Sequence, residues 1–121
     1  MMLKDHRRPE RAELASLSDA LTEIGNRRAW DLLIDTEEPR LSKFRDSASI
    51  VVLDLDNLKE VNDEFGHAAG NELLRQAAKY LKTVVRSRDF LDRVGGDEFA
   101  ILALEVGQEK IDEFGLRIQN T

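Results

Sequence analysis

The chain has 121 residues, a formal net charge of -6 and no cysteine. This length allows one domain with a single core, and the absence of cysteine excludes disulfides and thiolate chemistry. The acidic excess argues against sequence-independent binding to nucleic acid, which depends on summed Lys and Arg contacts. Because no apolar run could cross a bilayer and the first residues carry no secretory signal, we expect a cytoplasmic location without a membrane span.

The N-terminal region shows an apolar pattern at three- and four-residue spacings: Leu14, Leu17, Leu21 and Ile24. The pattern is compatible with an amphipathic helix or with the end of a coiled-coil connector, and four positions do not distinguish the two. We expect residues 1–18 to form a helical linker and residues 19–121 to form the domain. Asn26 is placed to cap a helix that ends before Pro39.

The middle of the chain alternates strand and helix patterns. A buried strand is expected over about residues 49–55, and Asn57 can cap the short helix that follows it. In that helix, Leu58, Val61 and Phe65 are expected to face the core. The opposite, polar face is expected to carry Lys59, Asn62 and Asp63. A longer helix after Gly70 has apolar residues at helical spacing: Leu73, Leu74, Ala77, Leu81 and Val84. A last helical pattern covers residues 110–120.

Residues 93–99 (Arg-Val-Gly-Gly-Asp-Glu-Phe) are the most informative stretch. The two glycines predict a tight two-residue hairpin turn with positive φ, followed by a strand over residues 99–104. Asp97 and Glu98 then lie at a rigid strand end, as Asp54 does on the earlier strand. Carboxylate oxygens are ligands that divalent cations prefer, so the pair of strand ends suggests one cation site. The alternative is a set of solvated strand-end acids.

Several short motifs occur together in order: Asp19-Ala-Leu-Thr, Asn26-Arg-Arg, Asp54-Leu-Asp, Lys59-Glu-Val-Asn-Asp, Phe65-Gly-His, Arg86-Ser-Arg-Asp and Gly95-Gly-Asp-Glu-Phe. In this order and spacing the chain closely resembles the GGDEF domain of diguanylate cyclases, from about Asp19 to the C-terminus. The resemblance implies an α/β sandwich with an antiparallel-rich central sheet flanked by helices, related to nucleotidyl cyclases and polymerase palms. The final strands and helix of that family fold are expected to be absent from this chain.

The resemblance implies an activity, a cofactor and partners. A homodimer condenses two GTP into the bacterial second messenger cyclic di-GMP and releases two pyrophosphates, under the control of an upstream sensor domain. Two Mg²⁺ or Mn²⁺ ions per GTP site are implied, with Asp54, Asp97 and the Leu55 carbonyl as ligands. Asp97, Glu98 and Lys59 are the implied catalytic residues, with Glu98 helping to deprotonate the attacking hydroxyl or supporting the metal shell. The alternative for Glu98 is a cross-strand ion pair.

By the same resemblance, Asn62 and Asn71 correspond to residues that read the guanine edge, and His67 lies beside the nucleotide. Asn71 replaces the Asp that is usual there, so guanine readout is expected to weaken and adenine to be better tolerated. A cyclase that uses both GTP and ATP and makes a mixed cyclic dinucleotide is therefore a further alternative, which rests on Asn71 alone. The structural alternatives are a helix N-cap for Asn71 and a partly buried loop histidine for His67.

Arg86 and Asp89 match the family's inhibitory site, where the arginine grips bound cyclic di-GMP. The alternative is a helix C-terminus at which Arg86 binds the last carbonyls. Glu23 stands where the family usually has Gly. If the backbone at this residue needs positive φ, the conformation is strained for Glu.

Two functions remain open. The first is a cyclase output domain, favoured by the intact acidic residues. The second is a non-catalytic module that binds GTP or cyclic di-GMP, favoured by Asn71 and by the expected absence of the C-terminal elements. That absence would also lower stability and turnover, and an open sheet edge would allow edge-paired or swapped dimers.

Overall fold

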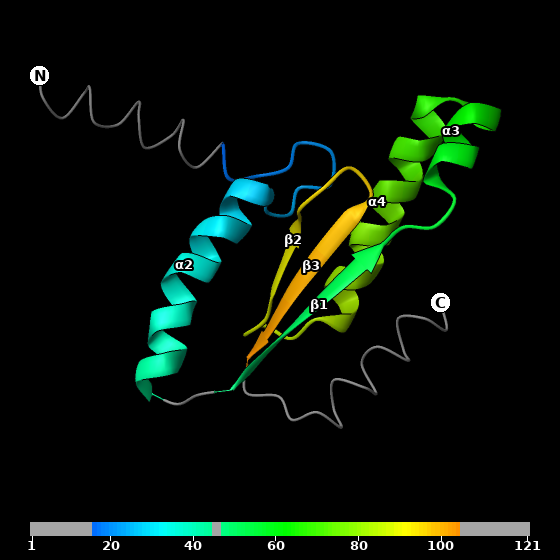
Figure 1. The fold of residues 1–121 in the computed structure, drawn as a ribbon. Helices are drawn as coiled ribbons and strands as arrows, with labels where there is room; N and C mark the ends of the chain where they lie inside the picture. The colour runs from blue at the N-terminus through cyan, green and yellow to red at the C-terminus, as the bar shows by residue number, and fades with distance from the viewer. Residues whose placement is uncertain (1–15, 45–46, 105–121) are drawn as a thin grey trace, which may run out of the picture.

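The computed structural model describes residues 16–44 and 47–104, which form helices on a small sheet (Figure 1). The elements in chain order are α2 (Arg27–Phe44), β1 (Ala48–Asp54), α3 (Leu58–Phe65), α4 (His67–Val84), β2 (Phe90–Arg93) and β3 (Glu98–Leu104). No helix in these two segments is long and apolar enough to span a membrane. The helical pattern expected over residues 110–120 lies outside the described residues.

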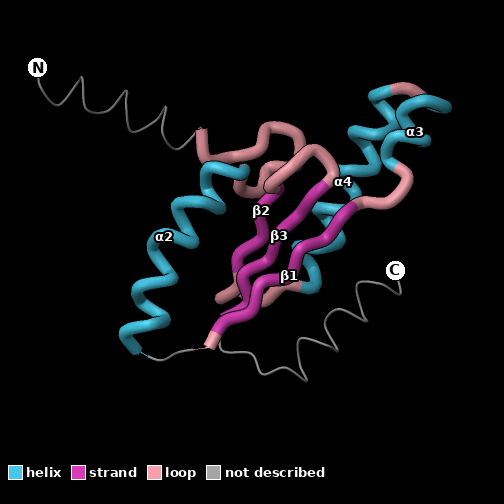
Figure 2. Tube along the Cα trace, in the orientation of Figure 1, coloured by secondary structure: helices cyan, strands magenta, loops and turns pink. Residues whose placement is uncertain are grey.

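The three strands form an antiparallel sheet in the order β1-β3-β2. Helices α2 and α4 lie on opposite sides of this sheet, as the tube view also shows (Figure 2). The expectation of an α/β fold with antiparallel pairing is therefore confirmed. The strand expected over residues 49–55 is β1, and the strand expected over residues 99–104 is β3.

The core lies between α4 and the sheet. Helix α4 presents Leu74, Ala78 and Leu81 on one face, because residues three and four apart share a side of a helix, and all three are buried. Phe99 and Ile101 alternate along β3 and meet them from the sheet. Burying aliphatic and aromatic side chains of this size contributes about 1.5–3 kcal/mol each, so this layer holds the strands in register.

Helix α2 covers part of the other face and differs from the expectation at one end. Asn26 caps it as expected, because its Oδ1 accepts a hydrogen bond of 3.0 Å from the Ala29 N–H. The expected end before Pro39 is wrong, since α2 continues to Phe44 with Pro39 inside it. A proline removes one helical hydrogen bond, but Ile34 and Leu41 on either side of it both face the sheet across a shallow pocket that Ala48, Ile50 and Leu102 also line. The helix thus keeps its apolar residues on the side of the sheet both before and after the proline.

The N-terminal residues 16–25 form turns rather than a helix. Leu17, Leu21 and Ile24 lie in this loop, and Ile24 is buried in the core while Leu21 packs beside it. Their spacing therefore reflects insertion of a loop into the core, and the helix interpretation fails over these residues; Leu14 lies outside the described residues. Glu23 has φ 65°, which confirms that this backbone adopts the left-handed conformation that favours glycine.

Asp92 is a buried carboxylate on β2, only 8% exposed. It packs against Gly25, where a Cβ would lie 2.0 Å from the Asp92 Oδ1, so no larger residue fits there without movement. Burial raises the pKa of Asp92 to about 6. The carboxyl group is thus protonated in the folded protein at pH values where it is ionised in the unfolded chain.

This shift predicts a pH-dependent stability difference. Below about pH 4 both states hold the proton, and as the pH rises to 6 the unfolded state loses it first, so the stability contributed by Asp92 falls and stays low above pH 6. We expect Asp92→Asn to raise the free energy of unfolding by about 1–3 kcal/mol at pH 8 and to change it little at pH 4. Urea denaturation at both pH values measures this. The exposed Asp63→Asn is the control, and an equal effect of Asp92→Asn at both pH values would contradict the prediction.

Candidate functional site

Antiparallel pairing of β1 with β3 brings the predicted acidic residues to one edge of the sheet. Asp54, the last residue of β1, lies opposite Glu98, the first residue of β3. The next backbone group continues the pairing, since the Leu55 N–H donates to the Asp97 carbonyl at 2.8 Å. The Asp54 and Asp97 residues are exposed and Glu98 is half-buried. We call these four residues the acidic edge.

The connection before the acidic edge is wider than the sequence suggested. Four residues, 94–97, join β2 to β3, and neither Gly95 nor Gly96 has positive φ, so the predicted two-residue turn is wrong. Gly95 is needed for a close approach instead: a Cβ there would lie 3.0 Å from Glu98 Oε1 and 3.2 Å from its Cβ. The Arg93 side chain supports the loop by donating to the Gly96 carbonyl at 2.7 and 3.2 Å.

Arg93 also connects this loop to the N-terminal part of the domain. Its guanidinium lies 3.2 Å from Asp19, and both side chains are only 18% exposed. Asp19 further accepts hydrogen bonds from the Thr22 N–H at 2.9 Å and the Thr22 hydroxyl at 2.6 Å. Burial raises the pKa of Asp19, but these bonds and the Arg93 charge outweigh it and hold the pKa below its usual value. The sequence alone did not predict the ion pair of Asp19 with Arg93. An Asp followed three residues later by Thr is nevertheless typical of a turn that is capped by side-chain hydrogen bonds.

The donors at the acidic edge suit a hard cation in kind. Two carboxylates and the Leu55 carbonyl offer the oxygen ligands that Mg²⁺ prefers. Within residues 16–44 and 47–104, however, no three Asp, Glu or His side chains gather closely enough to hold a metal ion by themselves. A cation at the acidic edge would therefore need further oxygens, such as those of water or a phosphate chain.

Asn62 is the predicted site residue whose environment is most unusual. Its Oδ1 is buried and has no hydrogen-bond partner, although Asn62 was expected on the polar face of this helix, opposite Leu58, Val61 and Phe65. The amide packs against the buried Gly70 of α4, where a Cβ would lie 1.7 Å from that oxygen. An unpaired buried acceptor costs about 1–3 kcal/mol.

Other expectations near Asn62 also change. Helix α4 begins at His67 with Gly66 at its N-cap, so Asn71 lies in the second turn and the N-cap alternative for it is wrong. His67 and Asn71 are both exposed, as is Lys59 on α3. Asn57 precedes α3 but makes no side-chain capping bond. Phe65, expected in the core, is 67% exposed because the short helix α3 packs on α4 rather than on the sheet.

Arg86 and Asp89 lie at the opposite end of the sheet. Arg86 holds the Asp89 carboxylate through its Nε at 3.0 Å and its Nη2 at 2.8 Å, and the Nη2 also donates to the Leu104 carbonyl. Burial raises the pKa of Asp89, but the Arg86 hydrogen bonds and charge hold it below its usual value. Since β3 has seven residues, this pair lies about 20 Å from the acidic edge.

The unpaired oxygen of Asn62 predicts an unusual mutational effect. We expect Asn62→Ala to raise the free energy of unfolding of the ligand-free protein by about 1 kcal/mol or more, because it removes an unsatisfied buried acceptor. Asn71→Ala is the matched control, since it gains only the helix propensity of alanine, about 0.5 kcal/mol. Urea denaturation measures both, and a loss of stability in Asn62→Ala would contradict the prediction.

Comparison with known proteins identifies the chain. The family described as "Diguanylate cyclase, GGDEF domain" matches residues 16–121. The chain belongs to the GGDEF family. It is 36% identical over 89 residues to the diguanylate cyclase DgcS of Shewanella oneidensis, covering 74% of this chain and 30% of that protein. It is 34% identical over 115 residues to the cyclic di-GMP phosphodiesterase PdeR of Escherichia coli, covering 95% of this chain and 17% of that protein.

Solved structures agree on the fold. The coiled coil and GGDEF domain of DgcB from Caulobacter crescentus, crystallised with cyclic di-GMP, superposes with a TM-score of 0.89 at 25% identity. That match covers 97% of this chain and 61% of the other. The chain thus spans less than a third of the length of the two curated relatives above.

Proposed function

We propose that this GGDEF domain condenses two GTP into cyclic di-GMP and two pyrophosphates. The observation that supports this most strongly is the acidic edge, where the β1–β3 pairing sets Asp54 opposite Glu98 and joins Leu55 to Asp97. Carboxylates on neighbouring strands are suited to hold a divalent cation against a triphosphate. Each of two facing domains would bind one GTP, so the proposal includes a homodimer.

The residues of the acidic edge would divide the work. Asp54, Asp97 and the Leu55 carbonyl would hold the Mg²⁺ or Mn²⁺ ions, two per GTP site. When bound, such ions offset negative charge on the phosphates and favour attack at phosphorus. Glu98, half-buried and packed over Gly95, would accept the proton of the attacking 3′-hydroxyl or orient a cation ligand. The exposed Lys59 would add a positive charge beside the phosphates.

Guanine recognition would centre on Asn62. Once the Asn62 side chain turns away from Gly70, against which its unpaired Oδ1 is buried, that oxygen can accept from the ring N–H or exocyclic amine of guanine, which adenine presents differently. Asn71 lies one residue after Gly70, against which Asn62 packs, and offers both an acceptor and a donor. Because an amide at residue 71 does not require two ligand donors, we expect the preference for GTP over ATP to be modest. His67 is proposed to lie at the side of the nucleotide.

A second candidate is a non-catalytic module that binds cyclic di-GMP at Arg86 and Asp89. The Asp89 side chain is 3% exposed and fixes the Arg86 guanidinium, which stays 39% exposed at the surface. A preoriented, partly exposed guanidinium suits bidentate binding to guanine or phosphate. PdeR, which matches 95% of this chain, is named for the breakdown of cyclic di-GMP and not for its synthesis, so a matching sequence also occurs in a protein that is not named as a cyclase.

The test is to incubate the protein with GTP, ATP and Mg²⁺ and to identify any cyclic dinucleotide by mass spectrometry. The proposal predicts cyclic di-GMP, with turnover lowered at least about 100-fold in Asp97→Ala because charge stabilisation is lost. Asp63→Asn, exposed on α3, is the control and should retain activity. Cyclic di-GMP binding that is lost in Arg86→Ala, without any product from GTP, would instead support the second candidate.

A further inference from the structure

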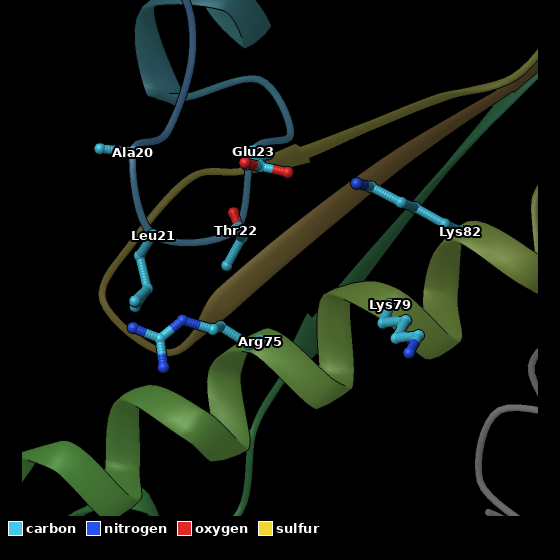
Figure 3. A pocket seen from close by; sticks show the side chains of 7 residues that line it. All are labelled: Ala20, Leu21, Thr22, Glu23, Arg75, Lys79 and Lys82. Atoms are coloured by element: carbon cyan, nitrogen blue, oxygen red, sulfur yellow. The ribbon is translucent and has the colours of Figure 1, made fainter.

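A cavity away from the acidic edge lies between α4 and the N-terminal loop (Figure 3). Its volume is about 700 Å³. We call it the α4 basic cavity, and its lining residues are Ala20, Leu21, Thr22, Glu23, Arg75, Lys79 and Lys82. None of the acidic-edge residues, and neither Arg86 nor Asp89, lines it.

Three cations on one face of α4 define the chemistry of this cavity. Arg75, Lys79 and Lys82 are separated by four and three residues, so they share a side of the helix and span about 10 Å along its axis. Like charges at these spacings destabilise a helix by about 0.2–0.5 kcal/mol per pair. The chain as a whole has a net charge of -6, so this local concentration of positive charge runs against its overall composition.

In the described part of the chain, the negative charge close to these three cations on α4 is small and comes mainly from Glu72. Arg75 pairs with Glu72 at 3.2 Å, and both side chains are at least half exposed. Lys79 and Lys82 form no close ion pair or hydrogen bond with the other described residues. The exposed Glu72 carboxylate also interacts with the Lys79 charge at longer range, so one carboxylate serves two of the three cations. Lys82 lies in the last turn of α4, where a cation also favours the helix dipole. That explanation does not extend to Arg75 and Lys79, which lie earlier in the helix.

The opposite wall of the cavity is preorganised. Thr22 is 6% exposed and is fixed by its two hydrogen bonds to Asp19. Among the described residues that line the cavity, Glu23 supplies the carboxylate. Figure 3 shows Lys82 extending toward the side of the loop that carries Glu23, and Arg75 extending toward Leu21. A wall held in place by internal bonds lowers the ordering cost of binding a ligand.

We propose that the α4 basic cavity binds an oligophosphate, a small molecule that carries two or three linked phosphate groups. Such a chain can contact cations spread over about 10 Å, whereas a single phosphate reaches only neighbouring pairs. Arg75 would bind one phosphate group in a bidentate manner, and the two lysines would act as point charges on the others. The phosphate chain of a nucleotide and a free inorganic oligophosphate share this chemistry. The acidic surface elsewhere disfavours long polyanions.

The test is isothermal titration calorimetry of the protein with sodium tripolyphosphate in EDTA. Without divalent cations, phosphates are not retained at the acidic edge, so the result is independent of the proposed cyclase activity. Lys79→Gln and Lys82→Gln should each weaken binding about 10-fold, the loss expected for one charge-assisted contact. Glu23→Gln should tighten it about threefold by removing an opposing charge. Lys43→Gln is the matched control, because Lys43 is exposed in the last turn of α2.

Parallel titrations with ATP and GTP in EDTA distinguish the ligand sources. Affinity equal to that of tripolyphosphate assigns recognition to the phosphate chain alone, and tighter binding of either nucleotide adds a contribution from the nucleoside; both results support the proposal. Absence of tripolyphosphate binding at millimolar concentration overturns it. So does unchanged affinity in both lysine variants, or equally tight binding of a short polyglutamate peptide, which would indicate a general electrostatic surface.

Discussion

The site and the core both depend on the register between β1 and β3. Because side chains alternate across a strand, a shift of one residue would move every β1 side chain to the other face of the sheet. Val51 and Leu53 pack against the core in the observed register, while Asp54 stays exposed opposite Glu98. The buried Ile101 of β3 pairs with Val51 and is fully enclosed. Apolar packing on one face therefore sets the position of carboxylates at the edge.

The N-terminal loop is a structural part of the domain rather than a simple entry segment. It reaches β2 through the contact of Gly25 with Asp92 and reaches the hairpin through the ion pair of Asp19 with Arg93. The same Arg93 holds the Gly96 carbonyl beside the acidic edge. The loop also forms one wall of the α4 basic cavity. A ligand that ordered this wall would thus act on a segment bonded directly to the hairpin.

Helix α4 combines three roles on different parts of its surface. One face supplies the core, as Leu74 and Leu81 are buried against the sheet. Its N-terminal turn carries Gly70, whose missing side chain admits the Asn62 amide. A third side carries Lys79 and its neighbouring cations, which line the α4 basic cavity. The helix is long enough to serve these sites because it has 18 residues, about 27 Å at the usual rise per residue.

The sequence by itself determined strands β1 and β3, the antiparallel α/β class, the cap at Asn26 and the family, since these follow from local patterns and from short motifs in fixed order. It did not predict that α2 continues through Pro39, that residues 16–25 form a loop, or that the glycine pair lies in a wider turn without positive φ. The burial of Asn62 was also decided only by the packing of α3 on α4. For Ile24 and Asn62, the deciding contacts join different elements or segments far apart in the chain. Such contacts are set by how layers pack, which local periodicity does not encode.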